Sequence, residues 1–277
     1  MTLHAPSYAG GFASRERGQL QHQNAWRGVV GAWCPSLGAT GSSLRDHSGL
    51  YHHGPLTGHT LSAAWADPHG LTFDGSNDYV PITNPARLVD LPTVTFAGWF
   101  KANGDYNSRQ ALMVAGAGWA ANWGVTFGFT DSKIELWNSA AGPVISSTAS
   151  ISDDEWHHYV LTRTGVTGDW DLAIYLDGKP DNTGNSAVNP QSASDCSIGR
   201  FGGFNSYFLN GIADGFLVYD RRITADEVAL LHSLGPGGMY QRRQPVFKAP
   251  AAGRINSLIG VGGGMIGYGG GMIGRGY

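Results

Sequence analysis

The chain of 277 residues is long enough for one large all-β domain or two smaller domains, and its core can fold without disulfide bonds. Charged residues make up 14% of it, against about 25% in an average protein, and its 42 glycines are about twice the usual share of ~7%. This composition disfavours a helical bundle and predicts a β-structure rich in turns.

Charge is segregated along the chain. Residues 228–277 carry five basic residues and no acidic one, and residues 1–28 have a net charge of +2, whereas residues 29–227 hold 10 basic and 20 acidic residues. An acidic body with basic ends can attract copies of itself and repels nucleic acid, although a solvated acidic surface with inert tails has the same pattern. We therefore expect no nucleic acid among the partners.

The N-terminus gives no sign of export. Met1–Tyr8 lack both the positive start and the apolar run of a secretory signal. No stretch approaches 18 apolar residues, so no membrane span or membrane partner is expected. Cys34 and Cys196 fall in expected strands, where two buried free thiols are favoured over a disulfide.

The predicted elements begin after a polar N-terminal arm, residues 1–27, which has no sustained apolar period. From Val29 onward, short runs rich in β-branched and aromatic residues recur between Gly, Asn, Asp and Pro clusters, which is the pattern of a sandwich. Leu172–Leu176 alternates before Asp177-Gly178 and predicts strand, turn and strand, because glycine accepts the positive φ of a tight hairpin.

One helix is expected near the end of the domain. Thr224 is placed as its N-cap, and Glu227 three residues later completes a capping box over free backbone amides. Val228 and Leu231 give it an apolar face, and Gly235-Pro236 ends it.

The C-terminal arm, residues 236–277, repeats Gly-Gly-Gly-Met-Ile-Gly at 262–267 and 269–274. Glycine this dense loses too much backbone entropy to fold alone, so we expect the arm to be ordered only against another subunit. Its expected assembly residues are Arg242, Arg243, Lys248, Arg254, Met265, Ile266, Met272 and Ile273.

An ordered series of short motifs carries a family resemblance. The motifs are Gly28–Trp33, Leu71–Val80, Thr93–Phe100, Trp156–Val160 leading to Ile174–Gly178, and Cys196–Arg200 leading to Gly211–Tyr219. Together they resemble the laminin G-like jelly roll of the concanavalin A-like lectin and glucanase superfamily. The resemblance implies an all-β, two-sheet antiparallel jelly-roll sandwich over residues 28–235, with one short C-terminal helix between the two extended arms.

The superfamily includes glucanases, whose catalytic strand bears two Glu and one Asp near alternate positions, as retaining hydrolysis requires. This chain has four Glu, none in such an array; Glu135 comes nearest but has no second carboxylate on its strand. Metalloprotease, Cys-x-x-Cys and nucleophile-elbow motifs are absent from the sequence. We therefore expect no catalytic residues and no enzyme activity.

Calcium is the one cofactor that the resemblance suggests, because many laminin G-like domains bind it through several oxygen ligands. The residues carried over are Asp74 and Asp78, with Asp214 in the final strand motif. In the alternative reading, Asp74 caps a turn and Asp214 bonds across strands.

Aromatic rings beside polar loops are the usual platform for sugars. Trp119, Trp123, Phe204 and Tyr207 lie in loop-like stretches and are the candidate ligand-binding residues, with packing beneath the loops as the alternative.

Three function classes remain. The favoured one is a virion structural protein, a capsid decoration or other exterior phage component, because phage particles assemble in the cytoplasm without secretion signals and this layout is similar to that of phage virion proteins. Its arms would bind other virion subunits or further copies, and the displayed domain a cell-surface glycan. The alternative is an extracellular carbohydrate-binding adhesin, and a glycan-active enzyme is disfavoured.

Overall fold

The computed structural model describes residues 22–240, except 66–69, 84, 86–87, 89–90, 105–107, 116–122, 129–130, 139–140, 190–195 and 202–205. The expected assembly residues of the C-terminal arm, from Arg242 to Ile273, lie outside the described residues. No helix in the described part has the length and apolar character needed to cross a membrane.

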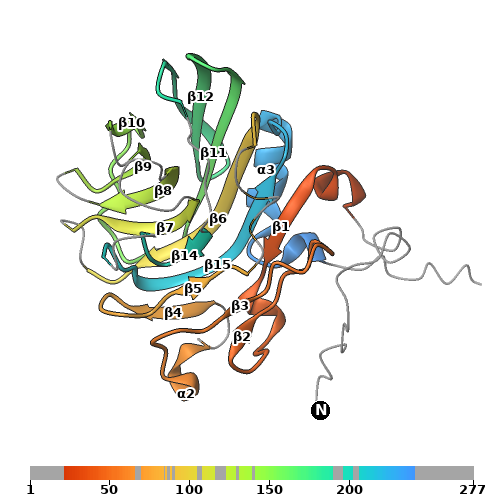
Figure 1. Ribbon diagram of the computed structural model, residues 1–277, viewed down its shortest axis with the longest axis vertical. Coiled ribbons are helices and arrows are strands. Elements are labelled where there is room, and N and C mark those ends of the chain that lie inside the picture. Colours follow the sequence, from red (N-terminus) through yellow and green to blue (C-terminus); the bar gives the residue numbers. More distant parts are fainter. Residues whose placement is uncertain are drawn as a thin grey trace, which may run out of the picture. The chain divides into compact units, whose positions relative to one another are not determined.

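Two large antiparallel sheets form the domain (Figure 1). The seven-stranded sheet has the order β1-β15-β6-β11-β12-β13, with β4 also paired to β15. Its strands are β1 (Val29–Trp33), β4 (Leu71–Asp74), β6 (Val94–Ala102), β11 (His157–Val166), β12 (Asp169–Leu176), β13 (Lys179–Ser186) and β15 (Asn210–Tyr219).

The six-stranded sheet has the order β10-β9-β8-β7-β14-β5. Its strands are β5 (Val80–Pro81), β7 (Gln110–Ala115), β8 (Trp123–Gly128), β9 (Lys133–Asn138), β10 (Gly142–Ser146) and β14 (Cys196–Ile198). Smaller elements are η1 (Gln23–Trp26), η2 (Pro35–Leu37), β2 (Ser43–Leu44), β3 (Gly54–Pro55), α2 (Leu61–Ala64), α3 (Ala225–Leu234) and η4 (Gly238–Tyr240). The predicted two-sheet jelly-roll sandwich is confirmed.

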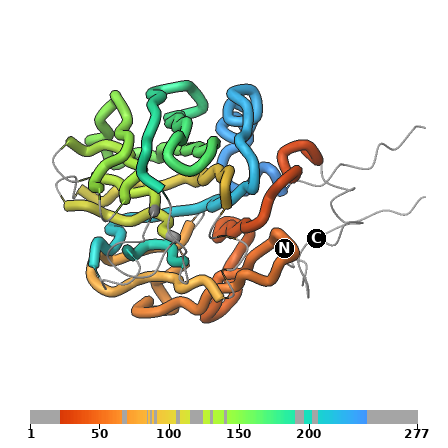
Figure 2. Tube along the Cα trace, turned by 45° about the horizontal axis from the view of Figure 1, so that its top comes forward, coloured from red at the N-terminus to blue at the C-terminus, as the bar shows by residue number. Residues whose placement is uncertain are grey.

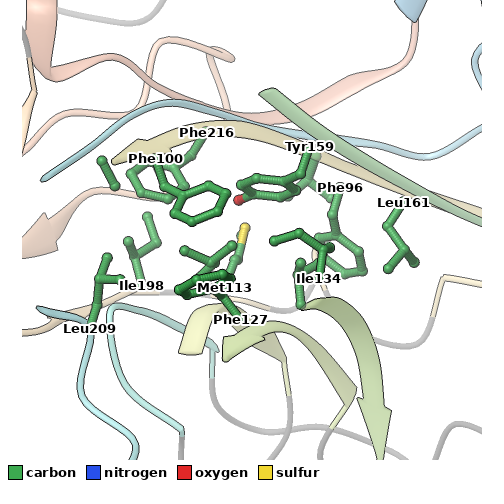
Figure 3. Packing of buried hydrophobic residues seen from close by; sticks show 14 of the residues in the cluster. Phe96, Phe100, Met113, Phe127, Ile134, Tyr159, Leu161, Ile198, Leu209 and Phe216 are labelled. Atoms are coloured by element: carbon green, nitrogen blue, oxygen red, sulfur yellow. The ribbon is translucent and has the colours of Figure 1, made fainter. Parts of the chain in front are cut away.

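The main core lies between the sheets. Phe100 and Tyr159 from the seven-stranded sheet meet Met113, Phe127 and Ile134 from the six-stranded sheet (Figure 3). Alternate side chains along a strand point to the same face of the sheet, and those that face this core are apolar.

The opposite face of the seven-stranded sheet is covered by a second apolar layer. Val228 and Leu231 of α3 pack there, on the face that the sequence predicted. The layer also contains Trp26 of η1, and Met239 and Tyr240 of η4, all buried. The packed region therefore extends beyond the expected range 28–235 at both ends, because these aromatic and apolar side chains pack against the outer face of the seven-stranded sheet.

Local chemistry explains the elements that the sequence placed correctly. The backbone N–H of Thr224 donates to Glu227 Oε2 (2.8 Å), and the backbone N–H of Glu227 donates to Thr224 Oγ1 (3.3 Å), which is the predicted capping box. Asp177 and Gly178 both have positive φ between β12 and β13, as the hairpin requires. Cys34 and Cys196 are buried and free, although Cys34 lies just after β1 rather than in it.

Candidate functional site

The turn between β4 and β5 brings Asp74 and Asp78 together. Asp74 Oδ1 accepts hydrogen bonds from the backbone N–H groups of Ser76 (2.8 Å) and Asn77 (3.1 Å). Asp78 Oδ2 accepts from the backbone N–H of Asp74 (3.1 Å). Gly75, at φ 76°, allows the chain to reverse here. The two carboxylates are thus held in place by the turn that carries them.

These carboxylates border a half-open pocket of about 180 Å³. The rest of its lining is small: Gly58, Thr60, Ala63, Ala64 and Thr72. Short side chains leave the space open, and the acids supply hydrogen-bond acceptors. Such a cavity suits a ligand that donates hydrogen bonds.

His59 lies against Asp78, the buried carboxyl group of the pocket. Its Nδ1 is 3.0 Å from the carbonyl oxygen of Thr57 and 4.0 Å from Asp78 Oδ1. Because a carbonyl only accepts hydrogen bonds, Nδ1 carries the proton. Burial lowers the pKa of His59, so the ring is neutral at pH 7. Its Nε2 is buried with no hydrogen-bond partner in the described part of the chain.

The two acids differ in their proton affinity. Burial raises the pKa of Asp78, and His59 offsets part of that rise. Burial also acts on Asp74, but the backbone N–H groups that it accepts from lower its pKa below the ordinary value. Asp74 is therefore the more acidic of the two carboxyl groups that face the pocket.

Further aromatic and polar side chains lie close to this turn in the sequence or pair with it. The guanidinium of Arg200 lies 3.7 Å from the ring centre of Tyr79, and Phe208 lies 6.3 Å from that ring. Asn210 pairs with Asp74 across β15 and β4. We call this set, with the Asp74 and Asp78 pocket, the loop end: Asp74, Asp78, Tyr79, Arg200, Phe208 and Asn210. Sequence reasoning missed Tyr79 and Phe208 as site residues, although Tyr79 lies within the motif Leu71–Val80 and Phe208 lies just before the motif Gly211–Tyr219.

Asp214 does not join the pair. Its side chain is fully buried, and its Oδ1 accepts from the backbone N–H groups of Gly215 (2.7 Å) and Ser36 (3.3 Å). It packs near Cys34 in the layer outside the seven-stranded sheet, because side chains alternate along β15. No group of three or more His, Cys, Asp or Glu in the described residues is placed to hold a metal ion. A calcium site built from all three expected acids therefore does not fit.

The structure describes two of the four expected aromatic ligand residues, Trp123 and Tyr207. Tyr207 is half-buried and packs edge-to-face against Phe201 (5.9 Å) and Trp137 (6.2 Å), as in the packing alternative. Trp123 is the first residue of β8 rather than a loop residue, because Trp123–Phe127 continues the alternation of a strand. Trp119 and Phe204 lie outside the described residues.

A second polar cluster lies on the outer face of the six-stranded sheet. Arg109 Nη2 donates to Glu135 Oε2 (3.0 Å), and its guanidinium lies 4.8 Å from the ring centre of Trp137. Thr126 and Ser146 direct hydroxyls at the same carboxylate, whose pKa is raised by burial despite Arg109. The i, i+2 spacing of Glu135 and Trp137 signals their shared face, but no local pattern identifies Arg109 as the partner.

A family model described as the concanavalin A-like lectin/glucanases superfamily matches residues 74–229. No curated protein matches the chain. Among solved structures, Trypanosoma rangeli sialidase is 19% identical with a TM-score of 0.55, over 74% of this chain and 32% of the sialidase. The binding domain of botulinum neurotoxin serotype D/C is 13% identical with a TM-score of 0.56, over 76% of this chain and 52% of that one.

At these identities the solved structures are similar in fold. The chain spans about a third of the sialidase and about half of the toxin chain. The family model, in contrast, covers more than half of this chain, from Asp74 at the end of β4 to the middle of α3. The chain therefore belongs to the concanavalin A-like lectin/glucanases superfamily.

Proposed function

We propose that the jelly roll is a carbohydrate-binding module and that its ligand site is the loop end. The observation that carries this proposal is the half-open pocket with two carboxyl groups on its wall, those of Asp74 and Asp78. Tyr79 directly follows Asp78 in the chain. Carboxylate oxygens accept hydrogen bonds from sugar hydroxyls, and an aromatic face covers the apolar side of a sugar ring.

The charge of the pocket selects among glycans. Asp74 and Asp78 repel an acidic sugar, whereas hydroxyl and ammonium groups are attracted. We therefore propose neutral or amine-bearing sugars as the ligand class. Similar structures support sugar binding in general: the sialidase was solved with sialic acid, and a related toxin structure is described by its interaction with two ganglioside molecules.

Binding to a panel of immobilised neutral, amine-bearing and sialylated glycans tests the proposal. We expect Asp78→Asn and Tyr79→Ala to weaken binding at least about tenfold, which corresponds to the loss of ~1.4 kcal/mol. Asp226→Asn, on the exposed side of α3, is the matched control and should bind as the parent does. Unchanged binding in both loop-end variants would place the site elsewhere.

We propose that the module is not an enzyme. Within the described residues, Arg109, Thr126 and Ser146 donate hydrogen bonds to the Glu135 carboxylate, and none of them carries a second carboxyl group. Retaining and inverting glycosidases both use a pair of carboxyl groups. Release of reducing sugar that is lost in Glu135→Gln would contradict this assignment.

We also propose that the protein is a virion component and that its arms are assembly elements. The basic arms and acidic body support it, and the same module on a secreted adhesin is the alternative. The truncation that tests it ends after Tyr240, because Met239 and Tyr240 are buried in the domain. This truncated chain should fold and fail to enter particles, and incorporation at the full-length level would refute the role of the tail.

A further inference from the structure

Tyr51, in the loop between β2 and β3, combines an exposed aromatic ring with a strained backbone. Its φ is 64°, in the left-handed region that non-glycine residues rarely adopt, and the residue is 60% exposed. Tyr207 has a similar φ of 55°, but its ring packs against Phe201 and Trp137. The ring of Tyr51 has His53 as its one aromatic neighbour in the described part of the chain, so packing does not explain why a tyrosine occupies this position.

Hydrogen bonds hold the loop between β2 and β3 in one conformation. Asp46 is buried, and its Oδ1 accepts from the backbone N–H groups of Ala32 (3.0 Å) and Ser48 (2.8 Å). Its Oδ2 accepts from the hydroxyl of Ser48 (2.7 Å) and the backbone N–H of His52 (3.0 Å). The indole N–H of Trp33 donates to the carbonyl oxygen of His52 (2.7 Å). Because the loop is already ordered, a ligand that binds to it has little further ordering cost to overcome.

His53 places a hydrogen-bond donor beside the ring of Tyr51. The two ring centres are 6.0 Å apart, and the ring planes meet at 86°. The backbone N–H of Asp46 donates to His53 Nδ1 (3.0 Å), so the imidazole carries its proton on Nε2. His53 is partly exposed, which leaves this edge of the loop accessible to a ligand. We call Tyr51 and His53 the aromatic platform.

The aromatic platform and the pocket at the β4–β5 turn lie at opposite ends of one antiparallel ribbon. At one end, the backbone N–H of Thr83 donates to the carbonyl oxygen of His53 (3.0 Å). At the other end, Thr57 and Tyr79 exchange backbone hydrogen bonds of 2.9 and 3.0 Å. Four residues of extended chain span about 13 Å, so the two places are too far apart to hold the same sugar ring.

The aromatic platform is also separate from the polar cluster of Arg109 and Glu135. Figures 1 and 2 show β2 and β3, in orange, on the opposite side of the domain from β8, β9 and β10, in green. Tyr51 is the one aromatic residue among the exposed large hydrophobic residues of the described chain, which are Leu37, Tyr51, Leu61 and Val166. The platform is thus a distinct feature of the surface.

We propose that the aromatic platform is a second sugar subsite, which stacks one neutral pyranose ring on Tyr51. The apolar face of a sugar covers an aromatic ring, and its hydroxyl groups accept hydrogen bonds from a donor such as His53 Nε2–H. Strained residues cluster at ligand sites, so contact with a ligand accounts for a tyrosine at this unfavourable φ. The proposal rests on the proposed function of the domain in carbohydrate binding and adds a contact outside the loop end.

Binding of the full chain to immobilised neutral glycans tests the subsite. Tyr51→Gly and Tyr51→Asn both tolerate the positive φ and lack the ring, so they should keep the parent's melting temperature and bind about three- to tenfold more weakly. Tyr51→Phe retains the ring and should bind within about twofold of the parent. Ser132→Gly, at φ 53° between β8 and β9, relieves the same backbone strain without removing a ring and should bind as the parent does. Unchanged binding by both ring-deleted variants, or a melting temperature lowered in both, would overturn the subsite.

A double-mutant cycle separates this subsite from the proposed function. The effects of Tyr51→Asn and Asp78→Asn on the binding free energy should add, because groups more than about 10 Å apart act independently. Loss of binding in Asp78→Asn alone would overturn the subsite and leave the loop end as the sugar site. Loss in the Tyr51 variants alone would support the subsite and place the loop end outside the sugar contact. A parent chain that binds no neutral glycan would contradict both.

Discussion

At the scale of the residue, His157 joins two acidic turns. Its Nδ1 lies 3.0 Å from Asp177 Oδ2, and its Nε2 lies 2.8 Å from Asp153 Oδ1. The hydrogen bond to Asp177 is the largest cause that raises the pKa of His157 to about 9, although burial opposes it. The ring is therefore cationic at neutral pH, between two carboxylates.

This pKa shift predicts a loss of stability in alkali. Because the folded pKa lies above the ordinary value of about 6.5, the stabilisation is complete below that pH and disappears as the pH rises through about 9. The melting temperature of the parent should fall between pH 7 and pH 9 more steeply than that of His157→Gln. Parallel profiles for the two proteins would show that the ring does not hold its proton in the fold.

Tyr159 carries a hydroxyl group that is buried in the main core. Its side chain is fully buried among Phe100 and Met113 (Figure 3), and its hydroxyl has no hydrogen-bond partner among the described residues. Its neighbour on β6 is Gly98, where a Cβ atom would lie 2.6 Å from that hydroxyl oxygen. Glycine is needed at this position because the tyrosine ring occupies the space of a side chain.

A buried hydroxyl group without a hydrogen-bond partner lowers the free energy of unfolding, so removal of the Tyr159 hydroxyl should not harm the fold. We expect Tyr159→Phe to raise the free energy of unfolding by about 1 kcal/mol. Urea unfolding measures the change. Gly98→Ala should destabilise the parent and be better tolerated in the Tyr159→Phe background. A Tyr159→Phe protein less stable than the parent would mean that the hydroxyl has a partner in the folded protein.

At the scale of the element, α3 shows how local signals fix a boundary. The capping box of Thr224 and Glu227 is reinforced by Arg221, whose guanidinium donates to both Glu227 oxygens at 2.8 and 2.6 Å. We expect Thr224→Ala to cost about 1 kcal/mol of unfolding free energy. Ser233→Ala, at the other end of the helix, is the control and should cost less. Equal effects at the two ends would argue against the cap.

The β4–β5 turn carries the prediction on calcium. Asp74 and Asp78 share the turn, whereas Asp214 is bonded to backbone amides elsewhere. Any stabilisation by calcium should therefore be lost in Asp78→Asn and kept in Asp214→Asn. Melting curves after chelation and after addition of calcium at ~100 times Kd would show a difference of about 2.7 kcal/mol for a bound ion. A calcium effect that depends on Asp214 would contradict the separation of the acids.

Sequence reasoning succeeded for elements whose cause is local. The alternation of β11 and β12, the Asp177-Gly178 turn and the Thr224 cap all depend on residues a few positions apart. It failed for Trp26 and Tyr240, which are buried only because distant segments meet on a sheet face. The same reason hid the contact of Arg109 with Glu135 and the distance of Asp214 from Asp74. Three-dimensional pairing decides these features, and no single stretch of sequence encodes them.

At the scale of the whole molecule, residues 23–240 present a pocket between the β4–β5 turn and α2, and the two arms precede and follow them in the sequence. The proposals assign sugar recognition to the pocket and assembly to the arms. If the two tasks are separate, loss of the arms should not alter the ligand site, because every pocket-lining residue lies between Gly58 and Asp78.

The most direct test of the central proposal is calorimetric titration of the full chain with matched neutral and sialylated oligosaccharides. If the loop end is the sugar site, the full chain should bind the neutral sugar measurably and the sialylated sugar more weakly. Asp78→Asn should lower the affinity for the neutral sugar at least about tenfold. Preference for the sialylated sugar, or equal affinity of the parent and Asp78→Asn, would contradict an anionic sugar site at the loop end.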